Sequence, residues 1–398
     1  MVMIQPEQRR VWVEIDLDAL EHNYRQIRAQ LRPETKLCCV IKANAYGHGA
    51  VDVAAVYERL GADLFAVSNI EEAIQLRRGC VERPILILGY TPAPCVRTLA
   101  EQGLTQCVYS YEYAEILSAC AVREGVTLDV HIKLDTGMGR IGFAVRGEET
   151  PNEDVLSELR RTCALKGLSV KGIFTHFAVA DDGEEGDAFC HEQYAAFSRT
   201  VKALEREGIT FEYQHCANSA ALTDHPDYHL NMVRAGIVLY GLAPSASVRH
   251  LPELRSVMTL KSVVSHIKSV TAGDSISYGR TFIAKQDMKI ATVPIGYADG
   301  YRRSSAEKGA SLLIRGQRCP IVGRVCMDQL MVDVSRLPLV CVGDEVTVFG
   351  CAPALSAAEL AELNDTIAYE TVCAVGVRVP RVYLRNGKIV RVRDNLLS

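Results

Sequence analysis

The sequence predicts an α/β fold in which a (β/α)8 barrel of the TIM type, over residues 1–245, precedes a mostly β domain over residues 246–398. Three observations predict it. Short β-like runs alternate with helix-like runs through the first part of the chain, eight such β-like runs can be counted, and after Pro244 the chain changes to short β-rich runs separated by turn residues. A doubly wound open sheet is the structural competitor, and the count of eight favours the barrel.

The barrel elements can be read in order. Asp16 or Asp18 can cap a first helix. The apolar face of that helix repeats near the helical period, at Leu20, Tyr24, Ile27 and Leu31. The strand-like runs are 37–41, 63–67, 85–89, 106–109, 128–134, 169–174, 211–215 and 231–234. Helix-like stretches lie between most of them, at 51–60, 71–78, 112–124, 153–165 and 187–207.

The second domain is expected to contain about 150 residues of mainly short strands. Its β-rich runs are 257–270, 289–295, 311–314, 320–325, 330–334 and 345–349, with one helix near 356–364. The segment 244–253, with its Pro, Ser and Ala residues, is the expected join. The run 11–15 could pair with either domain, so residues 1–12 are open to membership of the second one.

Composition excludes several classes of protein. The chain has 398 residues, of which 48% are apolar and 23% charged, which is typical of a globular protein. The net charge of −4 argues against a nucleic-acid or anionic-membrane partner, and no apolar run approaches the ~20 residues that cross a bilayer. The polar N-terminus shows no signal peptide, so we expect a cytoplasmic protein. The 14 Cys are scattered without CxxC spacing, so we expect buried reduced thiols and no metal site.

One lysine stands out because of its position. The string CVIKANAYGHG at 39–49 is an apolar strand that ends in Lys42 and continues into small residues, an aromatic and glycines. Strand ends of this kind face the active-site mouth of a barrel. Partial burial there lowers the pKa of a lysine, which frees its amine to form a Schiff base. By position alone, a strand-end lysine that extends into solvent is the commoner case.

The last two barrel strands end in segments suited to a phosphate. The string HCANSA at 215–220 ends strand seven at a helix start, where Ser219 offers a hydroxyl, although Ser and Asn are also ordinary helix caps. The string VRAGIVLYG at 233–241 ends strand eight. Because (β/α)8 enzymes often bind phosphate after strands seven and eight, we expect the group near Ser219, Gly236 and Ile237.

The string around Lys42 resembles the pyridoxal-phosphate lysine motif of alanine racemases. The run VWVEID at 11–16, with Asn23 in the first helix, is similar to the start of that family, and the resemblance extends over essentially the whole chain. It implies an enzyme of fold type III that uses pyridoxal 5'-phosphate to interconvert L-alanine and D-alanine by a two-base mechanism, supplying D-alanine for peptidoglycan. Lys42 would hold the cofactor and act as one base, and Tyr278, in SYGR at 277–280, would be the second.

The resemblance also implies roles around the cofactor ring. In HIKLDTGMGRIG at 131–142, Arg140 would bond the phenolic oxygen and Lys133 is the candidate for a carbamate that orients it. His176, in FTHFA at 174–178, would lie against the ring and hydrogen-bond both Tyr278 and Arg234. Arg234 would face the pyridine nitrogen. Since arginine is always protonated, that nitrogen would stay unprotonated, which discourages transamination.

The same family pattern implies the phosphate and substrate contacts. The phosphate ligands would be Tyr46, Asn218, Ser219, Gly236, Ile237 and Tyr369. Tyr369 would also narrow the pocket, and the substrate carboxylate would contact Arg140 and the backbone N–H of Met327. The strings IGYADG at 295–300 and GRVCMD at 323–328 match segments that line substrate access. The family forms head-to-tail homodimers in which Tyr278 and Met327 reach the partner's Lys42.

Three alternatives stay open beside this resemblance. A serine or broad-specificity racemase would use the same scaffold, but Tyr369 leaves room for a methyl side chain, and the broad-specificity group has a signal peptide. A fold-III decarboxylase shares the barrel and cofactor but has no reason to keep both Lys42 and Tyr278. A non-catalytic cofactor-homeostasis protein stops after the barrel, whereas this chain continues for about 150 residues.

Overall fold

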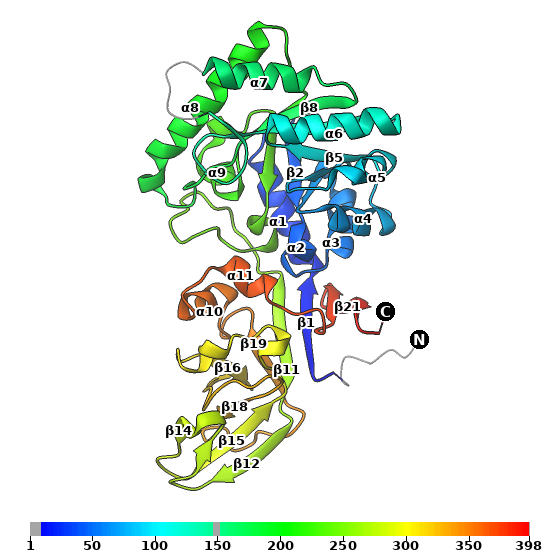
Figure 1. The fold of residues 1–398 in the computed structure, drawn as a ribbon. Coiled ribbons are helices and arrows are strands. Elements are labelled where there is room, and N and C mark those ends of the chain that lie inside the picture. The colour runs from blue at the N-terminus through cyan, green and yellow to red at the C-terminus, as the bar shows by residue number, and fades with distance from the viewer. Residues whose placement is uncertain (1–8, 146–151, 398) are drawn as a thin grey trace.

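Eight parallel strands form a nearly closed barrel in the first part of the molecule (Figure 1). The computed structural model describes residues 9–145 and 152–397, and its barrel strands are ordered β10-β2-β3-β4-β5-β6-β8-β9. Their bounds are β2 (Lys36–Val40), β3 (Leu64–Val67), β4 (Ile85–Ile87), β5 (Leu104–Val108), β6 (Leu128–Asp135), β8 (Leu168–Phe174), β9 (Tyr213–His215) and β10 (Met232–Ala235). A short strand, β7 (Phe143–Ala144), adds to β6. The predicted barrel is confirmed.

Helices surround these strands on the outside (Figure 1). They are α1 (Leu17–Ala29), α3 (Ala50–Leu60), α4 (Ile70–Arg78), α5 (Val96–Glu101), α6 (Tyr111–Glu124), α7 (Glu153–Cys163), α8 (Glu184–Arg206) and α9 (Ser219–Asp224). The short segment α2 (Lys42–Tyr46) lies instead at the end of β2. Asp16 is the residue that caps α1, because its carboxylate accepts the N–H groups of Asp18 and Ala19. The predicted apolar face of that helix is buried. It packs toward the barrel while the opposite face carries the charges.

The second domain is built mainly from short antiparallel strands. A seven-stranded sheet has the order β17-β16-β19-β11-β1-β20-β21, beside the smaller sheets β12-β15-β18 and β13-β14. The strands are β11 (Met258–Val263), β12 (His266–Val270), β13 (Ser275–Ile276), β14 (Phe282–Ile283), β15 (Met288–Val293), β16 (Ser311–Ile314), β17 (Gln317–Pro320), β18 (Leu330–Asp333), β19 (Glu345–Phe349), β20 (Arg381–Arg385) and β21 (Lys388–Arg393). Two helices, α10 (Ala357–Leu363) and α11 (Ala368–Cys373), lie at the side facing the barrel (Figure 1).

The first strand of the chain crosses into this second sheet. β1 (Val11–Asp16) pairs antiparallel with β11 and parallel with β20, and then leads directly into α1 of the barrel. Its apolar residues Val11, Val13 and Ile15 are buried. The two domains are therefore joined twice, once through β1 and once through residues 244–253.

One predicted strand of the second domain is not formed, whereas the predicted join between the domains is free of helix and strand. The predicted strand 320–325 is wrong, because β17 ends at Pro320 and the chain turns at Gly323, whose φ of +71° favours glycine. The expected join 244–253 contains no helix or strand, and it is hydrogen-bonded to the barrel domain. The buried carboxylate of Asp224 accepts the backbone N–H groups of Arg249 and His250, which holds the join against the barrel.

The cysteines are free thiols throughout. Many are buried, as predicted, but Cys80, Cys341, Cys351 and Cys373 are exposed. Across 9–145 and 152–397, no helix has the length and apolar character needed to cross a membrane.

Candidate active site

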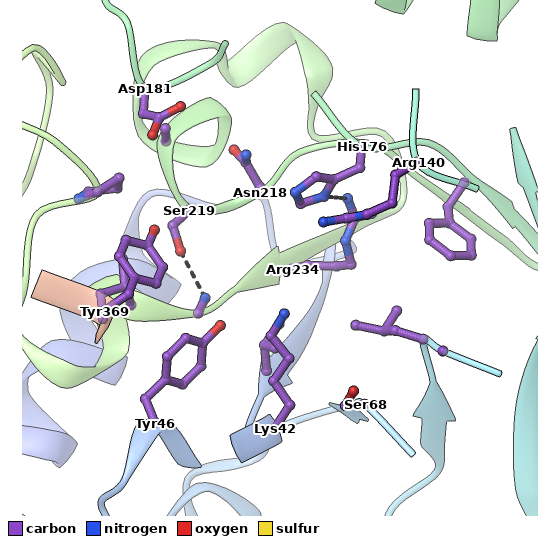
Figure 2. Close-up of a pocket in the computed structure, with 18 of the residues that line it drawn as sticks. Lys42, Tyr46, Ser68, Arg140, His176, Asp181, Asn218, Ser219, Arg234 and Tyr369 are labelled. Carbon is purple, nitrogen blue, oxygen red and sulfur yellow. Dashed lines mark hydrogen bonds between the residues drawn. The ribbon is translucent and has the colours of Figure 1, made fainter. Parts of the chain in front are cut away.

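A cavity of about 490 Å³ opens at the carboxyl ends of the barrel strands (Figure 2). Eleven residues singled out from the sequence line it: Lys42, Tyr46, Lys133, Arg140, His176, Asn218, Ser219, Arg234, Gly236, Ile237 and Tyr369. All but Tyr369, which α11 contributes, follow or end barrel strands. The strand-end rule for barrels explains why such distant parts of the sequence meet here.

Lys42 begins a turn of unusual handedness. The following residues Ala43, Asn44, Ala45 and Tyr46 have φ values between 51° and 54°, so α2 is a left-handed turn. Left-handed helical conformation costs L-residues roughly 1–2 kcal/mol each. Strain of this kind persists only where surrounding contacts enforce it, and it clusters at functional sites. The turn places the side chains of Lys42 and Tyr46 in the same cavity (Figure 2).

The amine of Lys42 is suited to act as a nucleophile and a base. Burial lowers the pKa of Lys42, and the positive charge of Arg140 lowers it further. The negative charge of Glu72 acts in the opposite direction, but the net pKa remains below its usual value. A lowered pKa increases the fraction of neutral amine, which is the form that attacks carbonyl carbon or accepts a proton.

Arg234 organises a buried relay of histidines. One guanidinium nitrogen donates to Nδ1 of His215 at 2.7 Å, and another lies 3.2 Å from Nδ1 of His176. Since arginine can only donate, each accepting Nδ1 is unprotonated and the proton of each neutral ring sits on Nε2. His215 Nε2 in turn lies 3.1 Å from Nδ1 of His131. Burial lowers the pKa of Arg234 to about 10, so the guanidinium is still charged at neutral pH.

The buried histidines predict a pH-dependent stability. Burial lowers the pKa of His48 to about 4 and that of His131 to about 3, from about 6.5 in an unfolded chain. Below pH 6.5 the unfolded chain therefore binds protons that the folded chain does not. The free energy of unfolding should fall with decreasing pH by about 1.4 kcal/mol per pH unit for each such histidine.

Urea unfolding at pH 7.5 and 5.5 measures this dependence. His131→Asn should lose less stability between the two pH values than the parent protein does. The matched control is His266→Asn, at an exposed position on β12, which should keep the parent's dependence. Equal pH dependence in all three proteins would contradict the assignment.

A second group of residues forms a cradle for an anion. The hydroxyl of Ser219 accepts the backbone N–H of Gly236 at 2.9 Å, and the Asn218 side chain caps α9 through the N–H of Ala221. A Cβ on Gly236 would lie 2.8 Å from the Tyr46 hydroxyl and 3.5 Å from the Ser219 hydroxyl. Glycine thus keeps open a space ringed by two hydroxyls and backbone N–H groups. That donor set fits a phosphate.

Lys133 lines the same cavity. Its ammonium donates to the carbonyl of Ile141 at 2.9 Å. Burial lowers the pKa of Lys133 to about 8, although the nearby Cys107 thiol acts in the opposite direction, and the charges of Arg140 and Arg234 lower it further. A substantial fraction of this amine is consequently neutral near pH 8.

Tyr278 and Met327 lie elsewhere. Neither lines the cavity, and their side chains are 67% and 53% exposed. Tyr278 follows β13 and precedes β14, and β14 lies in the part of the second domain that is turned away from the barrel (Figure 1). The segments that carry the two residues are in contact, because the Ser277 hydroxyl donates to the carbonyl of Arg324 and lies 3.7 Å from the Cys326 sulfur.

Some residues of the cavity were not found from the sequence. Ser68 and Gly89 follow strands β3 and β4, so the strand-end rule could have identified them. Asp181 lies in the loop between β8 and α8, and no sequence signal indicates its place in the wall.

Known proteins share this architecture over nearly the full chain. Residues 15–244 match the family model described as alanine racemase, N-terminal domain, and residues 257–383 match alanine racemase, C-terminal domain. An alanine racemase of Desulfovibrio desulfuricans is 47% identical over 94% of this chain and 98% of its own. A solved alanine racemase of Clostridium difficile has a TM-score of 0.92 at 41% identity, covering 98% and 99% of the two chains. The alanine racemase of Bacillus anthracis with bound L-Ala-P has a TM-score of 0.90 at 37% identity, covering 99% and 100%. The chain belongs to the alanine racemase family.

Proposed function

We propose that this protein interconverts L-alanine and D-alanine, with pyridoxal 5'-phosphate as its cofactor, and so supplies D-alanine for peptidoglycan. The observation that carries the proposal is a cavity lined by three features. They are Lys42 with its lowered pKa, the anion cradle at Ser219 and Gly236, and the buried Arg234. Family membership over both domains supports the same reaction. When bound, pyridoxal phosphate supplies an aldehyde for the substrate amine and a conjugated ring that stabilises negative charge at the α-carbon.

The residues of the cavity fit the parts of this cofactor. Tyr46, Ser219, Gly236 and Ile237, with Asn218 and Tyr369 beside them, would hold the phosphate. Arg234 would face the ring nitrogen, and its charge is held in place by His215 and by the carbonyls of Thr175 and Cys216. Since Arg234 stays protonated, it does not give up a proton to the ring. By leaving the ring nitrogen unprotonated, Arg234 would weaken the electron withdrawal that the cofactor supplies, which would discourage side reactions such as transamination.

Lys133 is proposed to carry a carbamate that orients Arg140. A carbamate forms when a neutral amine attacks carbon dioxide, and the pKa of about 8 supports a usable neutral fraction. The modification would also turn a buried positive charge into a negative one beside Arg140. The pair would then attract, and Arg140 would be held toward the cofactor oxygen and the substrate carboxylate.

Racemisation requires a base on each face of the α-carbon. Lys42 would exchange the proton on one face. Tyr278 of the partner subunit would exchange it on the other, since the Tyr278 of the same chain lies far from the cavity. Tyr278, Tyr297 and Met327 are large, exposed side chains. Their segments are in contact, because the N–H of Tyr297 donates to the carbonyl of Cys326 and the Ser277 hydroxyl lies 3.7 Å from the Cys326 sulfur. Their exposure supports a head-to-tail dimer in which Tyr278 and the backbone N–H of Met327 complete the partner's site.

A phenol is a weak acid, so a tyrosine that is to accept a proton needs its anion stabilised. His176 and Arg234 would provide this in the dimer. His176 Nδ1 is already bonded to Arg234, which leaves the proton on Nε2 available to a phenolate.

A substrate panel with circular-dichroism detection tests the proposed reaction. Alanine should be racemised from either enantiomer, and serine should be slower. A serine rate equal to or above the alanine rate would identify a serine racemase instead, and no rate on any amino acid would end the proposal.

Tyr369 should control the size of the accepted side chain. Its ring lies 5.9 Å from that of Tyr46, between centroids, and forms part of the cavity wall. Tyr369→Ala removes that ring, so kcat/KM for serine relative to alanine should rise by about tenfold. Thr371→Ala on the same helix, outside the cavity, is the matched control and should leave the ratio unchanged. An unchanged ratio in Tyr369→Ala would mean that the ring does not face the substrate side chain.

A further inference from the structure

We propose that Glu72, on α4, is a positioning residue that holds the left-handed turn of Lys42 in its strained conformation. The proposal deepens the proposed function and rests on it for the activity measurements alone. Glu72 does not line the cavity and is no part of the cofactor or substrate contacts. It acts on Lys42 through the backbone.

The turn is only partly stabilised by its own residues. The N–H of Ala45 donates to the carbonyl of Ile41, and the N–H of Gly47 donates to that of Ala43. His48 Nδ1 lies 2.9 Å from the carbonyls of Ala45 and Tyr46. As in any short helix, the first N–H groups have no partner inside the turn. Ala43 carries one of these N–H groups, directly after Lys42.

Glu72 satisfies that group from the neighbouring barrel unit. One carboxylate oxygen accepts the N–H of Ala43 at 2.7 Å, and the other accepts the N–H of Ser68 at 2.8 Å. The backbone N–H of Glu72 is itself fixed by the side chain of Asn69, the cap of α4. The carboxylate therefore ties the end of β3 to the peptide that follows Lys42, so that both neighbouring strand ends share one anchor.

The other end of the turn is anchored by the second domain. Arg381, on β20, donates to the carbonyl of Gly47 at 3.0 Å, and the Tyr383 hydroxyl donates to the carbonyl of His48 at 3.1 Å. A Cβ on Gly47 would lie 2.3 Å from the carbonyl oxygen of Val372, so α11 packs closely against this end of the turn. Glu72 therefore supplies the contact from the barrel domain that holds the Lys42 end of the turn.

The position of Ala43 allows a sharp test, because its φ of 51° suits glycine and its side chain is exposed. Ala43→Gly removes the conformational strain at this residue without touching Glu72. Glu72→Gln keeps the size of the side chain but removes one of its two acceptor oxygens and its charge. If Glu72 holds a strained backbone in place, Ala43→Gly should make the turn depend less on the Glu72 hydrogen bond.

The experiment compares the parent with Glu72→Gln, Ala43→Gly and the double variant. The readouts are the dissociation rate of pyridoxal phosphate, followed by absorbance, and kcat and KM for alanine. Glu72→Gln should release the cofactor about tenfold faster and lower kcat by about tenfold to a hundredfold, with KM within about twofold of the parent. Ala43→Gly alone should change each value by less than about twofold, and the double variant should recover most of the loss in both.

Glu71→Gln is the matched control, because Glu71 shares the first turn of α4 but is exposed. It should behave as the parent does. A Glu72→Gln variant that loses only thermal stability, or one that Ala43→Gly fails to rescue, would overturn the proposal. If the parent itself racemises no alanine, the cofactor dissociation rates still test the anchor, so failure of the proposed reaction remains distinguishable.

Discussion

Replacing Lys42 with alanine should lower alanine racemisation by about 10⁴-fold or more, in both directions. The residue has two proposed tasks, which are covalent attachment of the cofactor and proton exchange on one face of the α-carbon. General-base catalysis alone contributes about 10²- to 10⁴-fold, and loss of the covalent attachment adds to it. The lowered pKa of Lys42 and its place in the cavity support both tasks.

Circular dichroism measures the loss, and chemical labelling checks the attachment. Borohydride reduction of the cofactor-loaded parent, followed by peptide mapping, should place the pyridoxyl label on the peptide that contains Lys42. Lys36→Ala, at the opposite end of the same strand, should keep full activity. A label on another lysine, or a Lys42→Ala variant with substantial activity, would contradict the assignment.

The second large effect is expected for Tyr278. Tyr278→Phe removes the phenolic hydroxyl that would exchange the proton on the second face, so racemisation should fall by about 10²- to 10⁴-fold. Exchange of the α-proton with solvent should become unequal for the two enantiomers, because only the face served by Lys42 retains its base. Equal exchange rates for D- and L-alanine would refute the two-base mechanism. Tyr90→Phe, at an exposed position of the barrel domain, is the control and should be neutral.

Mixed dimers test whether the two bases come from different subunits. A Lys42→Ala subunit keeps Tyr278, and a Tyr278→Phe subunit keeps Lys42. If sites are shared, a mixed dimer contains one intact site and one doubly altered site, so activity should return on subunit exchange. If both bases came from one subunit, every site in the mixture would carry a substitution and no activity would return.

The sequence predicted the barrel well because each parallel strand is a compact apolar run with a helix after it. Convergence of strand ends predicted the positions of Lys42, Ser219, Gly236 and Ile237. The other predicted residues of the cavity came from the family resemblance, and Tyr369 lies on α11 rather than at a barrel strand end. The left-handed turn after Lys42 could not be predicted, because Ala43, Asn44 and Ala45 ordinarily favour right-handed conformations and the handedness here depends on contacts with distant residues.

Predictions in the second domain were weaker, for reasons of local sequence and of long-range pairing. β20 and β21 are rich in arginine, so they do not read as apolar runs, and α11 is only six residues long. The run 11–15 was correctly seen as strand-like, but its partners lie hundreds of residues away and no short-range pattern identifies them. Similarly, the distance of Tyr278 from the cavity depends on the relative placement of two domains.

The crossing of β1 into the second sheet has a consequence for biosynthesis. β1 is made before the barrel, whereas its parallel partner β20 follows the barrel and most of the second domain in the chain. At roughly 5–20 residues per second, synthesis of the intervening chain takes about 20–70 s. During that time the barrel can close while Val13 and Ile15, which β1 buries in the finished sheet, lack one neighbour. The growing chain therefore carries an incomplete apolar edge until β20 has been made.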